Sequence, residues 1–220
     1  SLHAALPVSV EVWASFIRYR AFGFSEQPFA GWLQNYAIGW ASTAVFYAVG
    51  LVALMALIRR MPRTWFVWAG AVYLALALIY TIATPSLIEP LTDSYTPLPN
   101  SALKREILVQ AHVAGVPADN VYTDDASRQS RRLNGHVSGT FGTARITIDD
   151  TALASPPSEV KALAAHEMGH YAMGHPFEMV LMASLIATFG FSLIAWLEPP
   201  LLRRAGRRWG LASATQTGSI

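Results

Sequence analysis

Three long apolar runs set the pattern of this chain. The first covers residues 37–58 without a charge, and the second runs from Trp65 to about residue 88. The third covers residues 177–197 and carries one charge, Glu178, near its start. A helix needs about 20 predominantly apolar residues to cross the hydrocarbon core of a bilayer. The pattern therefore predicts three transmembrane helices, of which the first two form a hairpin.

Polar positions concentrate between the second and third runs, in residues 89–176. An N-cap at Asn100-Ser101 opens a stretch with helical spacing, and the alternation at residues 145–148 is typical of a strand, as is the short run 121–123. Residues 134–141 fit an irregular edge strand. Such an edge can hold an extended peptide by strand addition, although a solvated hairpin explains the same residues equally well.

The predicted fold class is mostly α: a multi-pass membrane protein with three transmembrane helices and a small α+β segment. Hydrophobic residues make up 53% of the chain and charged residues 14%, which indicates the lipid bilayer as a partner. The net charge of only +2 argues against nucleic acid. The expected organisation is an amphipathic N-terminal segment (1–36), the hairpin (37–88), the α+β segment (89–176), the third transmembrane helix (177–198) and a basic tail (199–220).

The most specific chemical signal is His166-Glu167-Met168-Gly169-His170, which closes the polar segment. Residues four apart on a helix are neighbours, so both imidazoles can bind one Zn²⁺ at about 2.0–2.1 Å. Glu167 can then act as general base and acid toward a zinc-activated water. Two histidines on an ordinary core helix are the alternative. We predict His166 and His170 as zinc ligands and Glu167 as the catalytic residue of a hydrolase.

Several segments together carry a resemblance to a known family. The chain resembles the type I CAAX prenyl proteases, integral-membrane zinc metalloproteases, in Ala165-His-Glu-Met-Gly-His-Tyr171 with Gly174-His175, in residues 146–153, at Asn134-Gly135, in residues 85–98 and in residues 20–33. The resemblance implies a zincin-like domain, a membrane-embedded endopeptidase and a peptide or protein substrate. It also implies substrate contacts on the edge segment, which we assign to Asn134, Gly135 and His136. Arg132-Leu133 departs from the family's Ser-His before this asparagine.

The sequence offers no third zinc ligand of the kind that a catalytic site requires. The resemblance implies a glutamate on a helix downstream, together with a cationic side chain for the oxyanion. Glu178 follows the helix breakers Gly174 and Pro176, and we interpret His175 as a helix-end residue. A partner subunit or a C-terminal segment outside the 220 residues would then supply the ligand. The alternative is a truncated or inactive homologue that acts as a membrane scaffold or partner subunit.

The expected location is the bacterial inner membrane, because 14 arginines against two lysines are typical of a GC-rich bacterial genome. The side of the active site stays open. Arginines in the hairpin turn and after the third run favour an extracytoplasmic site by the positive-inside rule. The eukaryotic members of the resembling family imply a cytosolic one.

Overall fold

A computed structural model describes residues 8–139 and 142–209. It divides into two compact units, residues 1–43 with 82–176 and residues 44–81 with 177–220. The described helices are α1 Val8–Glu11, η2 Val12–Ile17, α2 Arg18–Ala21, α3 Phe29–Arg60, α4 Trp65–Ala83, η3 Thr84–Ile88, η4 Glu89–Leu91, α5 Ala102–Val113, η5 Ala126–Arg128, η6 Ala152–Ala154, α6 Pro157–Ala172 and α7 His175–Trp209.

Three helices in the described part of the chain are long and apolar enough to cross a membrane: Phe29–Arg60, Trp65–Leu91 and His175–Arg204. This confirms the predicted class, a mostly α protein with three membrane helices and a small sheet. α3 begins at Phe29, before residue 37, because polar residues do not end a helix: Gln34 is a good helix former and Asn35 is tolerated. α7 likewise continues through Pro199 and Pro200 into the predicted basic tail, of which residues 210–220 lie outside the described part.

The helices of the second unit pack closely at small residues. A Cβ atom on Gly70 of α4 would lie 2.0 Å from Oγ1 of Thr188 of α7, so only glycine fits this crossing. The ring of Trp65 contacts that of Phe191 with 6.1 Å between centroids. Hydroxyl groups along α7 donate to carbonyls four residues earlier, as Ser184 does to Val180 (2.7 Å), so they add no unpaired donor to an apolar helix.

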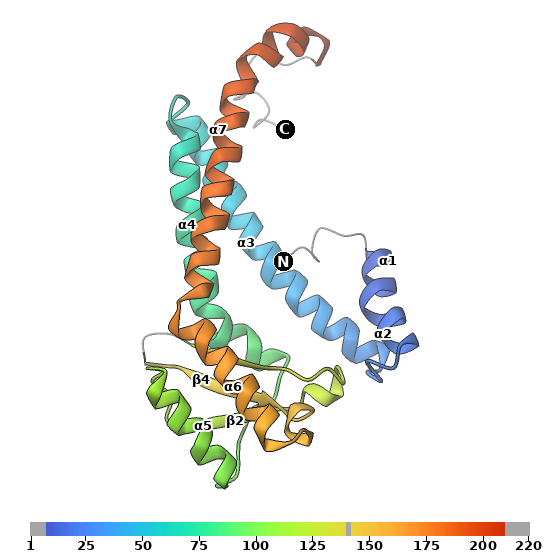
Figure 1. The fold of residues 1–220 in the computed structure, drawn as a ribbon. Helices are drawn as coiled ribbons and strands as arrows, with labels where there is room; N and C mark the ends of the chain where they lie inside the picture. Colours follow the sequence, from blue (N-terminus) through green and yellow to red (C-terminus); the bar gives the residue numbers. More distant parts are fainter. Residues whose placement is uncertain (1–7, 140–141, 210–220) are drawn as a thin grey trace. The chain divides into compact units, whose positions relative to one another are not determined.

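The first unit contains a four-stranded sheet in the order β1-β2-β4-β3. Its two inner strands, β2 and β4, are labelled in Figure 1. The strands are β1 Thr96–Pro97, β2 Val121–Asp124, β3 Gly135–Ser138 and β4 Arg145–Asp149. β2 and β4 are parallel, and the other two pairs are antiparallel. β3 therefore lies at an edge of the described sheet, as predicted from residues 134–141, of which 140 and 141 lie outside the described part.

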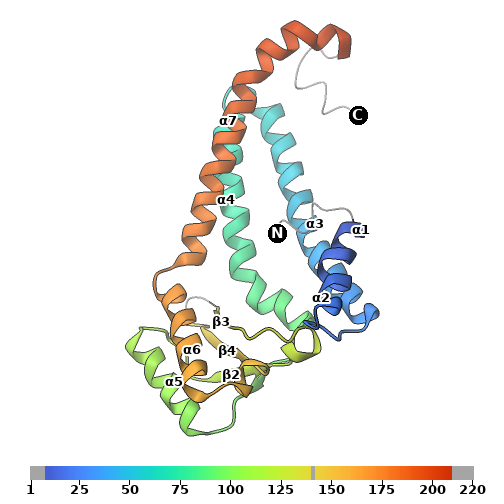
Figure 2. The ribbon, with the colours of Figure 1, turned by 45° about the vertical axis from the view of Figure 1, so that its right-hand side comes forward.

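One face of this sheet carries the hydrophobic core. Ile146 and Ile148 of β4 are fully buried, together with residues at helical spacing on α5 and α6. Both helices pack on this face, as Figure 2 shows. Ser101 caps α5 by accepting a hydrogen bond from the Lys104 backbone nitrogen (3.2 Å), as its sequence predicted. Because side chains alternate along a strand, Thr147 and Asp149 of β4 point to the opposite face.

Candidate functional site

Helix α6 positions the histidine motif. It begins with proline in its first turn and buries Val160, Ala164 and Met168, four residues apart, in the core. This apolar stripe fixes the rotation of the helix. His166 and His170 consequently lie on an exposed face, and Glu167 between them in sequence is partly buried.

The structure brings the two predicted zinc ligands together. The Nε2 atoms of His166 and His170 are 3.1 Å apart. Two nitrogens bound tetrahedrally to one Zn²⁺ at 2.0–2.1 Å are about 3.4 Å apart, so this donor pair fits a shared zinc ion with little adjustment. The same separation suits a hydrogen bond between the rings with one as donor. The residues that would hold zinc are therefore in place on α6.

His175 adds a contact that sequence reasoning missed. Gly174, with φ of 70°, turns the chain after α6, and His175 begins α7 with its Nδ1 atom 2.6 Å from Nδ1 of His170. When Nδ1 of His170 carries the proton, it donates to His175 and leaves Nε2 as the metal-binding atom. His175 lies at a helix end, as predicted, since it begins α7, and its ring in addition contacts that of His170, a predicted zinc ligand.

A third protein ligand is not assembled around this pair within the described residues. The one group there that brings three imidazole or carboxylate donors together lies elsewhere, on the sheet. Glu178 stands in the first turn of α7, beyond the break at Gly174.

The predicted substrate-edge residues divide between two environments. A Cβ atom on Gly135 would lie 3.0 Å from the Thr147 carbonyl and 3.5 Å from Cδ2 of Leu163 on α6, so glycine lets β3 approach the helix closely. Asn134 is exposed, and its carbonyl accepts a hydrogen bond from the Asp149 backbone nitrogen (3.2 Å). The side chain of His136 points to the face of the sheet away from α6, so the structure does not bring it to His166 or His170.

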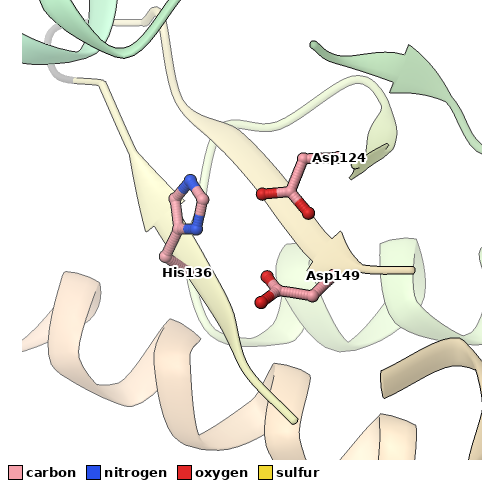
Figure 3. Close-up of side chains that lie close together, drawn as sticks. All are labelled: Asp124, His136 and Asp149. Atoms are coloured by element: carbon pink, nitrogen blue, oxygen red, sulfur yellow. The ribbon is translucent and has the colours of Figure 1, made fainter. Parts of the chain in front are cut away.

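On that face His136 meets Asp124 and Asp149 (Figure 3). Burial, followed by the charge of the Asp124 carboxylate, raises the pKa of Asp149 to about 7. Burial also raises the pKa of Asp124, while His136 lowers it. The sequence did contain a signal for this cluster, since Asp124 and Asp149 each end a strand, but only the parallel pairing of β2 and β4 makes them neighbours.

Comparison with known proteins places the chain in a family. A model described as peptidase family M48 matches residues 97–213, and one described as CAAX prenyl protease N-terminal, five membrane helices, matches residues 2–94. The chain is 32% identical to "Uncharacterized metalloprotease YhfN" of Bacillus subtilis over 83% of its own length and 43% of that protein. It is 29% identical to "CAAX prenyl protease 1" of Saccharomyces cerevisiae over 88% of its length and 43% of the relative.

The fold is shared with a solved structure, Ste24p of S. mikatae, with a TM-score of 0.77 and 23% identity over 87% of this chain and 45% of the other. The chain thus spans less than half the length of these relatives. The expected resemblance is confirmed. Because the first family model covers more than half of its residues, the chain belongs to peptidase family M48.

Proposed function

We propose that this chain forms the catalytic layer and adjoining membrane helices of a zinc metalloendopeptidase of the CAAX prenyl protease type. The observation that carries the proposal is the convergence of the His166 and His170 Nε2 atoms, 3.1 Å apart, on an exposed face of α6. Membership of peptidase family M48 supports a metal-dependent peptidase. Zinc is the metal that two imidazoles in this motif favour.

Each residue of the motif has a distinct role in the proposal. His166 and His170 hold the metal, and His175 fixes the tautomer of His170 through the Nδ1 contact. Bound zinc supplies Lewis acidity toward water and toward the scissile carbonyl. Glu167 takes a proton from the attacking water and later delivers it to the leaving amine. The third ligand comes from a partner subunit or a further segment of the protein.

The edge strand β3 supplies the substrate contact in this proposal. Leu163 of α6 lies against Gly135, and at about 100° per residue the positions of Leu163, His166 and His170 fall within about 60° of one another around the helix. The strand therefore runs beside the face that carries the histidines. Asn134 and Gly135 would align an extended peptide by strand addition, and His136 would contribute its backbone.

The protein is an integral membrane protein by its helices and its family. We place it in the bacterial inner membrane, because one of its relatives is from Bacillus subtilis and arginine far outnumbers lysine. Peptides or proteins are the substrate class. The side of the membrane on which cleavage occurs follows from protease-accessibility mapping of residues 100–176 in oriented vesicles.

The test pairs zinc content with cleavage, both measured in detergent on the whole protein together with any subunit that copurifies with it, because the proposed third ligand lies outside these 220 residues. His166→Ala should lower zinc by about one ion per chain, whereas Glu167→Gln should keep the ion and lower cleavage of an unstructured fluorogenic peptide by about 10²- to 10⁴-fold. Glu159→Gln is the matched control, since Glu159 is an exposed glutamate on the same helix. It should change neither readout.

Two results would contradict the proposal. One is a folded parent chain whose zinc content is the same as that of His166→Ala. The other is cleavage that Glu167→Gln leaves unchanged. A whole protein that holds zinc at His166 and His170 but cleaves no peptide, with its copurifying subunits present, would favour the inactive scaffold instead.

A further inference from the structure

Three strands bring a second set of ligand-type side chains together, on the face of the sheet away from α5 and α6. Asp124 and Asp149 are direct partners in the parallel β2–β4 pair, and His136 of β3 is the partner of Thr147, two residues before Asp149. Each of the three side chains offers one donor atom within 4.8 Å of the other two. Figure 3 shows them pointing toward one another.

Each of the three side chains has one buried donor atom without a hydrogen-bond partner within the described residues. Asp124 is 7% exposed and Asp149 6% exposed, and the Oδ1 atom of each is unpaired within the described residues. Nε2 of His136 and Oγ1 of Thr147, on the same face, are buried and unpaired there too. Unpaired buried carboxylates are costly, and proteins normally pair them with a cation or a metal.

The cation nearest in the sheet is already engaged elsewhere. Arg145 lies on the same face of β4, but its guanidinium donates to Glu89 (2.7 Å) and stacks over the Tyr95 ring at 3.7 Å. Asp93 and Asp150 add further negative charge, since both raise the pKa of Asp149. In the described part of the chain, no salt bridge pairs Asp124 or Asp149 with a lysine or an arginine, and His136 is the basic group that lowers the pKa of Asp124.

We propose that Asp124, His136 and Asp149 form a second metal site, for a divalent transition-metal ion of the Zn²⁺ or Mn²⁺ class. Two carboxylates match the charge of a divalent ion. The imidazole favours a transition metal over Mg²⁺ or Ca²⁺, which prefer all-oxygen sites. Donors on one Zn²⁺ are about 3.4 Å apart, so binding draws these atoms together by about 1.4 Å at most. Thr147 supplies a further oxygen.

The site has a structural consequence for the edge strand. β3 has one neighbouring strand in the described sheet, β4, and an ion shared by His136, Asp149 and Asp124 would tie it to both inner strands. Metal would therefore hold the register of the strand on which Asn134 and Gly135 lie. It would act away from the histidines of α6 and take no part in the hydrolytic step.

The test removes the α6 histidines so that only the second site can bind. The chain carrying His166→Ala and His170→Ala, stripped with chelator, is titrated with Zn²⁺ by calorimetry and, separately, with Mn²⁺ by electron paramagnetic resonance. It should bind about one ion per chain. Adding Asp149→Asn should weaken binding at least tenfold, by analogy with the loss of a metal-site group. Asp119→Asn, at an exposed carboxylate outside the cluster, should leave binding unchanged.

His136→Gln keeps both carboxylates, and it tests the site independently in case the Asp149→Asn chain does not fold. It should also weaken Zn²⁺ binding at least tenfold while the far-ultraviolet circular dichroism stays that of the parent. The proposal is overturned if the folded double-histidine variant binds neither ion at tens of micromolar. Binding that survives both Asp149→Asn and His136→Gln would overturn it as well. Asp124 and Asp149 would then share a proton in place of a metal.

Discussion

The α+β unit holds two polar clusters that are assembled in opposite ways. His166 and His170 belong to one helix, are exposed, and meet because they are four residues apart. Asp124, His136 and Asp149 come from three strands, are buried or partly buried, and meet only through the register of the sheet. The two histidines of α6 can therefore be replaced without altering the fold. The strand cluster is linked to folding, because its electrostatics exist only in the folded sheet.

The largest expected effect is on zinc affinity, when His175 is replaced. His175→Ala removes the acceptor at Nδ1 of His170, and loss of such an outer contact typically weakens metal binding 10- to 100-fold. Zinc affinity is measured by competition with a chelating dye in the Asp149→Asn background. This background weakens the proposed second metal site, so the measurement reports zinc binding at His166 and His170. The melting temperature without metal should stay close to that of the same background.

A matched pair of variants separates positioning from packing. His175→Gln keeps a side-chain oxygen that can accept from His170 and should recover much of the affinity, whereas His175→Leu keeps volume alone and should not. Equal zinc affinity in all of these variants would show that α7 does not orient the ligand.

The same contrast explains what could be predicted from the sequence. His166, Glu167 and His170 needed only the helical period, and the Ser101 cap needed only its neighbours. The contact of His175 was missed because the sequence predicts a break at Gly174 but not the direction in which its positive φ turns the chain, which brings His175 back to His170. The strand cluster was missed because β2 and β4 are separated by β3 along the chain yet pair directly. Their spatial order depends on tertiary packing, which local alternation does not encode.

An intermediate effect is expected from pH in the absence of metal. The pKa of Asp149 is raised to about 7 in the folded chain, by burial first and then by Asp124, Asp150 and Asp93. Between the unfolded pKa of 3.8 and this value the folded state binds more protons than the unfolded state. The contribution of protonated Asp149 to the free energy of unfolding is therefore complete below pH 3.8, and it is lost as the pH rises toward 7.

The measurement is unfolding in detergent with excess chelator, at pH 5 and pH 6. From pH 5 to pH 6 the free energy of unfolding of the parent chain should fall by about 1.4 kcal/mol more than that of Asp149→Asn, because asparagine does not titrate. His136 and Asp124 face the same carboxylate and remain in both chains, so the difference reports the titration of Asp149 together with its coupling to these two groups. Parallel pH profiles for the two chains would mean that this carboxyl keeps an ordinary pKa.

The smallest effect is expected when both α6 histidines are replaced and stability is measured. His166→Ala with His170→Ala abolishes the proposed zinc site, but both side chains are exposed and alanine favours a helix more than histidine does. With chelator present, the free energy of unfolding should therefore change by no more than about 0.5 kcal/mol in the destabilising direction. Chemical unfolding in detergent, run beside the parent, measures it. A loss of several kcal/mol would contradict this expectation, because it would mean that the α6 histidines, like the strand cluster, are coupled to folding stability.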